Sequence, residues 1–270
     1  MIISMNSIIT FTSDFGTQGH YAGEVKGVLL SVNPEAKLVD ISHQVAAHNL
    51  LEAAYIIARV YRAFEPRTVH LLVVDPGVGS SRRGLVVEAD HHLFVAPDNG
   101  ILSLVFAEAV VQRVISIEAE HYFRRPVSPT FHGRDIFAPV AAQLSTGSSP
   151  QSFGPEVKDY ARLSLPEVNE VTPGVWEGFI LHIDRFGNII TSIRPEKIRN
   201  KLGRDFKIDR FTIQDQDIDT HVDHYAAGAE GTLFSLVSSG GYYEIAALKK
   251  SAAAMLNARR GMKVMLEITT

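Results

Sequence analysis

The stretch VHLLVVDPGVG, residues 69–79, decides the fold of the amino-terminal part of the chain. Its first six residues form a largely apolar run, which is typical of a strand that is covered on both faces of a sheet. The run ends at Asp75-Pro76-Gly77, a sequence that favours a tight turn. In parallel sheets, ligand sites form at the carboxyl ends of the strands. Asp75 is therefore a candidate site residue, and the alternative is that it only caps the turn.

Strand-like and helix-like patterns alternate around this stretch. The strand-like runs cover residues 7–12, 37–41, 85–88 and 93–96, and the helical patterns cover residues 21–31 and 49–64. This alternation predicts an α/β domain with a mainly parallel central sheet. The first strand runs into Ser13-Asp14-Phe15-Gly16, so the carboxylate of Asp14 also lies at a strand end.

The pattern changes near Leu163, which predicts a domain boundary. Residues 1–164 form the predicted α/β domain, the polar and proline-bearing residues 165–177 a linker, and residues 178–270 a smaller domain. Short strand-like runs then cover residues 178–183, 189–193, 206–213, 232–237, 242–246 and 264–268, with a helix at 251–257. Many short strands separated by turns predict an antiparallel β-barrel domain.

Composition excludes several classes of function. The chain has 270 residues, of which 46% are hydrophobic, and its 26 basic and 30 acidic residues give a net charge of −4. This balance does not favour a nucleic acid or an anionic membrane surface as partner. There are no cysteines, hence no disulfides or thiolate nucleophile. No apolar stretch approaches the about 20 residues that a bilayer requires, and we expect no signal peptide at the N-terminus. We expect a soluble cytoplasmic protein.

The loop after the apolar stretch combines a carboxylate with guanidinium groups. Asp75 is followed by Arg82 and Arg83 across a glycine-containing turn. Such a loop could present backbone N–H groups to an anion, but it lacks the Lys-Ser/Thr ending of a nucleotide-binding P-loop. A solvated ion pair, which contributes only about 0–1 kcal/mol, is the alternative interpretation.

Two further stretches carry side chains suited to catalysis or binding. His132-Gly133 precedes a predicted helix start with Asp135 in its first turn, which indicates an active-site loop. In the second domain, Phe186 could stack on a purine and Asn188 could hydrogen-bond its edge, although an ordinary hairpin turn also uses such residues. The small residues at 238–241 would allow a ligand to approach the backbone.

Taken together and in order, these segments resemble the SAM hydroxide adenosyltransferase family, the adenosine-forming S-adenosylmethionine hydrolases related to fluorinase and chlorinase. The resemblance extends from Ile8 to Ile268. It rests on SDFG (13–16), VDPGVGSSRR (74–83), APDNG (96–100), TFHGRDIFAPVAA (130–142), IDRFGN (183–188) and SSGGYYEIA (238–246).

This resemblance implies a fold, a reaction and an assembly. The fold is an N-terminal α/β domain followed by a C-terminal β-barrel. The reaction is hydrolysis of S-adenosylmethionine to adenosine and L-methionine, with no metal and no cofactor. The assembly is a homotrimer whose sites lie between subunits, with a small-molecule nucleoside substrate and with neither nucleic acid nor membrane as partner.

The resemblance also assigns catalytic roles. Asp75, Arg82 and His132 match the set that positions water near the ribose 5′ carbon, and Arg83 is an adjacent alternative to Arg82. A histidine can accept or relay a proton at neutral pH. A guanidinium can stabilise hydroxide character in a desolvated pocket. His132 is thus expected to act either as a base or as a group that orients water.

Substrate-binding roles follow in the same way. The family's binding positions correspond to Asp14 for the ribose hydroxyls, Phe186 and Asn188 for adenine, Asp184 and Ser239 for the methionine amine and carboxylate, and Glu244 and Ala247 at the border of the adenine. Two positions depart from the family pattern. Gly19 stands where an aspartate facing the substrate amine is common, and Ser238 stands where an asparagine is common.

Three other functions remain as alternatives. A halide-using relative is disfavoured, because the loops carry charged, proton-accepting groups and residues 85–97 lack the fluorinase's insertion. A non-catalytic adenosine or S-adenosylmethionine binder is the second. The third is a metal-dependent hydrolase that uses Asp14, Asp75, Asp98 and His132, since Mg²⁺ and Mn²⁺ prefer oxygen ligands.

Overall fold

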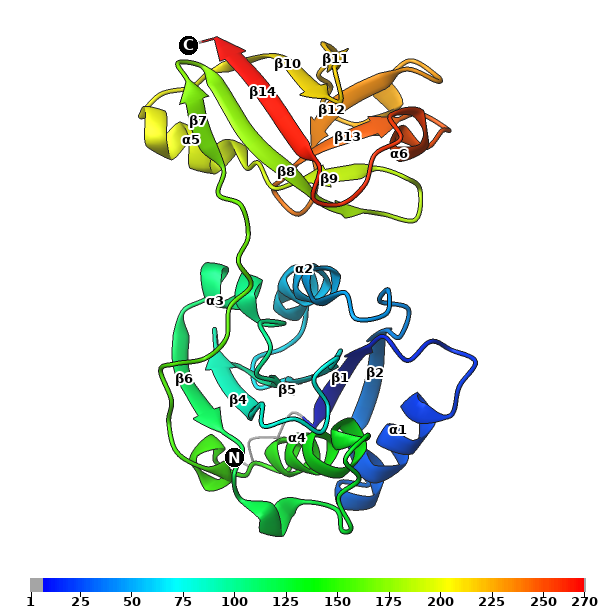
Figure 1. Ribbon diagram of the computed structural model, residues 1–270, viewed down its shortest axis with the longest axis vertical. Coiled ribbons are helices and arrows are strands. Elements are labelled where there is room, and N and C mark those ends of the chain that lie inside the picture. The colour runs from blue at the N-terminus through cyan, green and yellow to red at the C-terminus, as the bar shows by residue number, and fades with distance from the viewer. Residues whose placement is uncertain (1–6, 270) are drawn as a thin grey trace. The chain divides into compact units, whose positions relative to one another are not determined.

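The computed structural model describes residues 7–269 and divides the chain into two compact units, Met1–Leu163 and Ser164–Thr270 (Figure 1). Each unit has its own sheet and its own hydrophobic core. The mixed α/β architecture followed by an antiparallel barrel confirms the predicted fold class. None of the helices in residues 7–269 is long and apolar enough to cross a lipid bilayer.

The amino-terminal unit is built on a 6-stranded sheet with the order β2-β1-β3-β5-β4-β6. Its strands are β1 (Ile8–Ser13), β2 (Lys37–Ser42), β3 (Val69–Val73), β4 (Gly84–Ala89), β5 (His92–Pro97) and β6 (Val111–Ser116). β1, β2, β3 and β5 pair in parallel, whereas β4 pairs antiparallel with both β5 and β6. Every residue of β3 is buried, as expected for a strand covered on both faces.

Helices cover both faces of this sheet. The helical segments of the unit are α1 (Tyr21–Val32), α2 (Leu50–Val60), η1 (Tyr61–Ala63), α3 (Ser103–Glu108), η2 (Glu120–Tyr122), η3 (Gly133–Phe137), α4 (Ala138–Ser145) and η4 (Pro150–Phe153). α1 and α4 pack on one face, where Val25 and Val140 meet Phe11 and Leu71. α2 and α3 pack on the other face (Figure 1). The loops at the carboxyl ends of β1 and β3 carry Asp14 and Asp75.

The carboxy-terminal unit is an 8-stranded antiparallel sheet that curls into a nearly closed barrel. Its strands are β7 (Asn169–Thr172), β8 (Val175–Ile183), β9 (Ile189–Thr191), β10 (Lys207–Ile213), β11 (Gln216–Ile218), β12 (Leu233–Val237), β13 (Tyr243–Ala247) and β14 (Lys263–Thr269). The helical segments are α5 (Pro195–Leu202), η5 (Tyr225–Ala227) and α6 (Ala252–Met255). Trp176, Ile180, Phe211 and Leu266 fill the interior.

The segment predicted as a linker, residues 165–177, is not irregular throughout. It contains β7 and the first residues of β8, which pair with each other. Pro173-Gly174, interpreted above as linker sequence, instead closes the hairpin between them. Gly174 has a φ of 77°, the conformation that the third residue of a type II turn requires after proline.

Candidate active site

Asp75, Arg82 and His132 meet at the carboxyl end of β3. Oδ1 of Asp75 accepts a hydrogen bond of 2.8 Å from Nε of Arg82, and Oδ2 accepts one from Nη2. The same Nη2 lies 2.9 Å from Nδ1 of His132. The side chains of Arg82 and Asp75 are only 10% and 5% exposed. A bidentate, charge-assisted pair therefore holds the guanidinium in place while it contacts the imidazole.

Two glycines allow these groups to approach one another. Gly79 has a φ of 81°, and a Cβ at this position would lie 2.4 Å from the carbonyl oxygen of Pro129. A Cβ on Gly133 would lie 2.7 Å from Cγ1 of Val73 in β3. The first glycine thus holds the turn after Asp75 against the segment before His132. The second lets η3, a π-helical turn, pack closely on β3.

The guanidinium of Arg82 fixes the tautomer of His132. A guanidinium can only donate, so Nδ1 of His132 must accept, and the neutral ring carries its proton on Nε2. Burial and the positive charge of Arg82 lower the pKa of His132 from its ordinary value of 6.5. The neutral ring therefore predominates at pH 7.

Arg83 points to a different cluster. It donates hydrogen bonds of 2.8 Å to Asp98 and 3.0 Å to Asp159, and Asp98 also accepts one of 2.7 Å from the Ala161 N–H. Arg82 rather than Arg83 therefore contacts Asp75. Within residues 7–269, no group of three or more His, Asp or Glu side chains is arranged to hold a metal ion, and Asp98 does not join the other members of the metal-binding alternative.

Asp75 and His132 line a cavity of about 300 Å³ that we term the N-terminal pocket, with Arg82 behind them. Asp14 lies at the same pocket, where its Oδ2 accepts a 2.9 Å hydrogen bond from the His48 N–H. His48 also lines the pocket, and its Nδ1 is 4.0 Å from that oxygen. His48 was not singled out from the sequence, because no local pattern marks it. Its φ of 65° is a feature that only the structure reveals.

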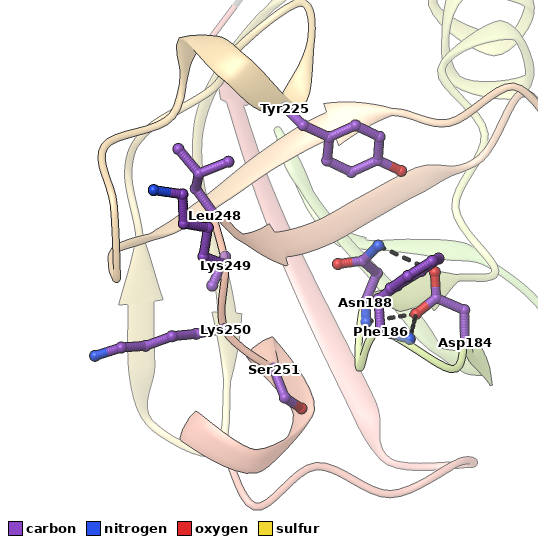
Figure 2. A pocket seen from close by; sticks show the side chains of 9 residues that line it. Asp184, Phe186, Asn188, Tyr225, Leu248, Lys249, Lys250 and Ser251 are labelled. Carbon is purple, nitrogen blue, oxygen red and sulfur yellow. Dashed lines mark hydrogen bonds between the residues drawn. The ribbon is translucent and has the colours of Figure 1, made fainter.

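A second cavity of about 600 Å³, the C-terminal pocket, lies in the other unit (Figure 2). Asp184 builds its rim, since its carboxylate accepts hydrogen bonds of 2.9 Å from the Phe186 N–H and of 2.8 and 3.0 Å from the Asn188 N–H and Nδ2. The resulting turn leaves the Phe186 ring 77% exposed at the pocket. Asp184 is thus engaged in the turn, and its contact with a methionine amine stays a prediction.

Glu244 lies behind the C-terminal pocket. It is buried, its Oε1 accepts a 2.7 Å hydrogen bond from the Tyr225 hydroxyl, and burial raises its pKa. Tyr225 and Ala247 both line the pocket. Tyr225 was missed from the sequence, because a tyrosine in an irregular segment carries no signal of its own. Ser239 is exposed in the turn before β13 and is not among the residues that line either pocket.

The structure therefore places the predicted residues in two sets. Asp14, Asp75 and His132 share the N-terminal pocket, with Arg82 adjoining it. The adenine-binding candidates share the C-terminal pocket, with Glu244 next to it. Their assigned roles remain predictions. The first set offers a shielded guanidinium, a carboxylate and a neutral imidazole, which can bind and orient a small polar molecule.

Family models match both units. Residues 9–154 match the SAM hydroxide adenosyltransferase N-terminal domain, and residues 178–265 match the corresponding C-terminal domain. Among solved structures, that of an uncharacterized conserved protein from Thermotoga maritima is similar with a TM-score of 0.89 and 34% identity, covering 96% of this chain and 99% of that one.

Relatives with a named activity are also similar to this chain. The (R)-S-adenosyl-L-methionine hydrolase of Thermus thermophilus is 33% identical over 270 residues, which cover 96% of this chain and 98% of that protein. The hydrolase of the same name from Methanocaldococcus jannaschii is 36% identical over 72% of this chain and 70% of its own length. A fluorinase from Actinopolyspora mzabensis is 26% identical, covering 95% of this chain and 96% of that protein.

Proposed function

This chain belongs to the SAM hydroxide adenosyltransferase family, and from that premise we propose that it is an enzyme that hydrolyses S-adenosyl-L-methionine to adenosine and L-methionine. The names of its relatives specify the (R) epimer, and we extend the proposal to that epimer. One observation carries it: the Arg82 guanidinium bonds both Asp75 and His132 at one pocket. These three side chains together can bind and orient a water molecule.

The reaction needs a nucleophile more than it needs an acid. The water oxygen forms a bond to the ribose 5′ carbon while the bond from that carbon to sulfur breaks. The electron pair of the broken bond stays on sulfur, so methionine departs as a neutral thioether without protonation. The water loses a proton, and each turnover releases one proton to solvent. The protein must therefore orient water and favour its loss of a proton.

Each member of the set has a distinct task. His132 carries its ring proton on Nε2, because Nδ1 accepts from Arg82. It therefore serves as a hydrogen-bond donor that orients water rather than as the first proton acceptor. The carboxylate of Asp75 keeps lone pairs beyond those that Arg82 occupies and accepts a hydrogen bond from the same water. The positive charge of Arg82 stabilises the hydroxide character that develops.

Substrate binding uses both pockets. Asp14 takes the ribose hydroxyls, for which the two oxygens of a carboxylate are suited. Phe186 stacks on adenine and Asn188 bonds its edge, with Glu244 and Ala247 at its border. Asp184 and Ser239 are assigned to the methionine amine and carboxylate on the strength of the family resemblance.

We extend the proposal to assembly and location. Since the two sets of residues lie in different units, a homotrimer with each site between neighbouring subunits would bring them together in one site. The proposed reaction uses S-adenosylmethionine as substrate and requires no resident metal or cofactor. Activity that survives EDTA, a trimer in light scattering and a cytoplasmic fraction on cell fractionation are the results expected.

The central experiment is a product assay. Purified protein is incubated with each epimer of S-adenosylmethionine, with and without chloride or fluoride, and the nucleosides are separated by chromatography. We expect adenosine, formed together with one proton per turnover. His132→Ala should lower kcat by about 100-fold or more, whereas replacement of His121, an exposed histidine in η2, should not. Failure to form adenosine above the His132→Ala level would refute the proposal, and a 5′-halogenated nucleoside would replace hydrolysis with halide transfer.

A further inference from the structure

The turn at residues 98–100 follows β5 and belongs to the APDNG motif, to which the proposed mechanism assigns no task. Asp98 and Asn99 are not among the residues that line the N-terminal pocket. Their side chains instead contact the two ends of the 74–83 loop, which joins β3 to β4. This loop carries the carboxylate and the guanidinium of the proposed mechanism. The turn can therefore act on these two groups only through the loop.

Asn99 holds the residue that precedes Asp75. Its Nδ2 donates a 2.9 Å hydrogen bond to the carbonyl oxygen of Val74, and its Oδ1 accepts one of 3.2 Å from the Ile101 N–H. The parallel pairing of β3 with β5 extends to Leu71 and stops before Val74. The Asn99 amide thus fixes the backbone where pairing to β5 has ended, one residue before the carboxylate.

Asp98 holds the other end of the loop, and the turn itself is supported from behind. The Asp98 N–H donates a 2.9 Å hydrogen bond to the carbonyl oxygen of Arg83, and its Oδ2 accepts bonds of 3.1 and 2.8 Å from the Arg83 guanidinium. Its Oδ1 accepts a 2.7 Å bond from the Ala161 N–H. A Cβ on Gly100 would lie 3.0 Å from the backbone nitrogen of Leu163. Because neighbours on both sides hold this turn, it can serve as a fixed support for the loop.

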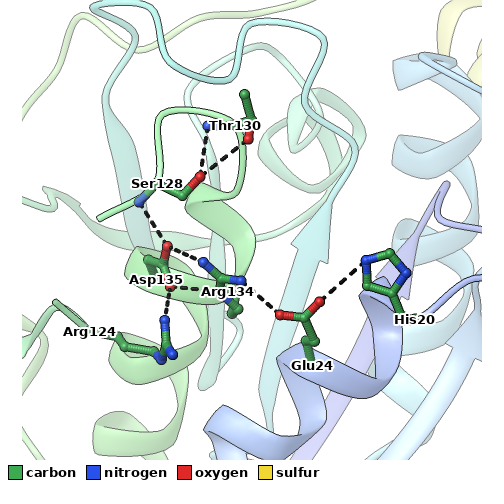
Figure 3. Close-up of polar contacts among 7 residues, drawn as sticks. All are labelled: His20, Glu24, Arg124, Ser128, Thr130, Arg134 and Asp135. Carbon is green, nitrogen blue, oxygen red and sulfur yellow. Dashed lines mark hydrogen bonds and ion pairs between the residues drawn. The ribbon is translucent and has the colours of Figure 1, made fainter. Parts of the chain in front are cut away.

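His132 is held by a different set of contacts. It precedes η3, where the buried carboxylate of Asp135 accepts hydrogen bonds from Arg134, from Arg124 at 3.1 Å and from the Ser128 N–H at 2.9 Å (Figure 3). Burial alone would raise the pKa of Asp135, but these partners lower it below its ordinary value, so the carboxylate stays charged at pH 7. The 2.9 Å contact of His132 with the guanidinium therefore depends on where the loop presents that guanidinium.

We propose that Asn99 is a positioning residue, which by holding the Val74 carbonyl sets the place of the Asp75 carboxylate. That carboxylate in turn holds the guanidinium that contacts Nδ1 of His132. Without the Asn99 bond the end of β3 can shift, and the guanidinium and the imidazole then separate. A misplacement of about 1 Å can cost about 100-fold in rate. This inference rests on the proposed function, because it takes these groups to orient the attacking water.

The test places serine at two asparagines that make the same kinds of contact. The serine side chain is one bond shorter, so Asn99→Ser keeps an acceptor for the Ile101 N–H but withdraws the donor from the carbonyl. Asn33→Ser is the matched control. Asn33 accepts a 3.2 Å hydrogen bond from the Glu35 N–H, also two residues later, and donates one of 2.8 Å to Ser145. It lies at the C-terminal end of α1 and does not line the N-terminal pocket.

On the full-length protein we expect Asn99→Ser to lower kcat about tenfold or more while KM changes less than about twofold. The side chains that contact the bound substrate remain in this variant. An NMR titration of His132, assigned through His132→Gln, should show its pKa moving up toward the ordinary value of 6.5. Arg82 lowers this pKa by more than Asp75 raises it, and Asp135, which also raises it, stays in place.

Asn33→Ser should leave kcat and the pKa of His132 unchanged, although it too removes a side-chain hydrogen bond. Circular dichroism should show that both variants are folded. An unchanged kcat or an unchanged His132 pKa in Asn99→Ser would overturn the inference, and so would an equal loss of kcat in the two variants. If the wild-type protein forms no adenosine, the proposed reaction fails, and the pKa of His132 alone then decides whether Asn99 positions Arg82.

Discussion

Replacement of Phe186 by alanine should separate an effect on binding from an effect on folding. The ring is 77% exposed at the C-terminal pocket, so its removal takes almost no apolar area out of a core. We expect the free energy of unfolding to change by less than about 0.5 kcal/mol. Stacking of a base on an aromatic ring contributes about 1–3 kcal/mol. Adenosine should therefore bind about 5- to 150-fold more weakly.

The measurement pairs adenosine titration calorimetry with denaturant unfolding. Phe179 is the matched control, because it lies in β8, the strand that runs into the turn of Phe186, but is only 5% exposed. Phe179→Ala should cost about 3–5 kcal/mol of stability. Phe186→Tyr keeps the stacking face and should retain most of the affinity. Unchanged affinity in Phe186→Ala would refute the stacking role, and a loss of stability comparable to that of Phe179→Ala would show that the ring serves the fold.

Three further predictions concern pH and the amino-acid end. Because burial and Arg82 lower the pKa of His132 and its neutral form is the active one, kcat/KM should fall with acid only below pH 6.5. If kcat/KM already falls with acid above pH 6.5, the assignment of neutral His132 as the active form is wrong. Burial lowers the pKa of His70 to about 3, so below about pH 6.5 the unfolded chain binds a proton that the folded chain does not. The free energy of unfolding should then drop by about 2 kcal/mol on going to pH 5, and His70→Gln should flatten this slope in denaturant titrations. Gly19 lacks the positive φ that would strain a side chain, and a Cβ there would lie 3.6 Å from Cδ2 of Tyr21. Gly19→Asp should therefore fold normally and strengthen binding of S-adenosyl-L-homocysteine over 5′-methylthioadenosine, which lacks the amino-acid end; equal effects on the two would contradict a role at the amino-acid end.

The elements that the sequence predicted well are those with strong local patterns. The buried strand β3 and the hairpin of β4 and β5 follow from apolar runs and from the turn at Asp90-His91, where both residues have positive φ. α3 was missed because six residues are too few to establish a helical period. β6 was missed because only its last three residues are buried, whereas its first three are half-buried or exposed, as is common in an edge strand.

The candidate site divides in the same way. Asp14 and Asp75 could be predicted because both follow buried strands, and strand ends of a parallel sheet gather at one edge. The choice between Arg82 and Arg83 could not be made, since neighbouring side chains leave a turn in different directions and only the packed turn decides which one meets Asp75. The place of Tyr225 at the C-terminal pocket depends on the barrel, which brings η5 to β13. No local sequence pattern indicates such a contact between distant residues.

The charges at the N-terminal pocket disfavour a halide as nucleophile, even though this chain is similar to fluorinases. Asp14 and Asp75 both line the pocket, whereas Arg82 lies behind Asp75 and is already paired with it. A sulfonium cation entering this pocket meets carboxylates of opposite sign, which favours its binding. A halide would meet the same carboxylates with like charge and would have to give up its hydration as well. Water is neutral and meets no such repulsion, and it can donate to Asp75 and accept from His132 while the positive charge of Arg82 stabilises the hydroxide character that develops on it.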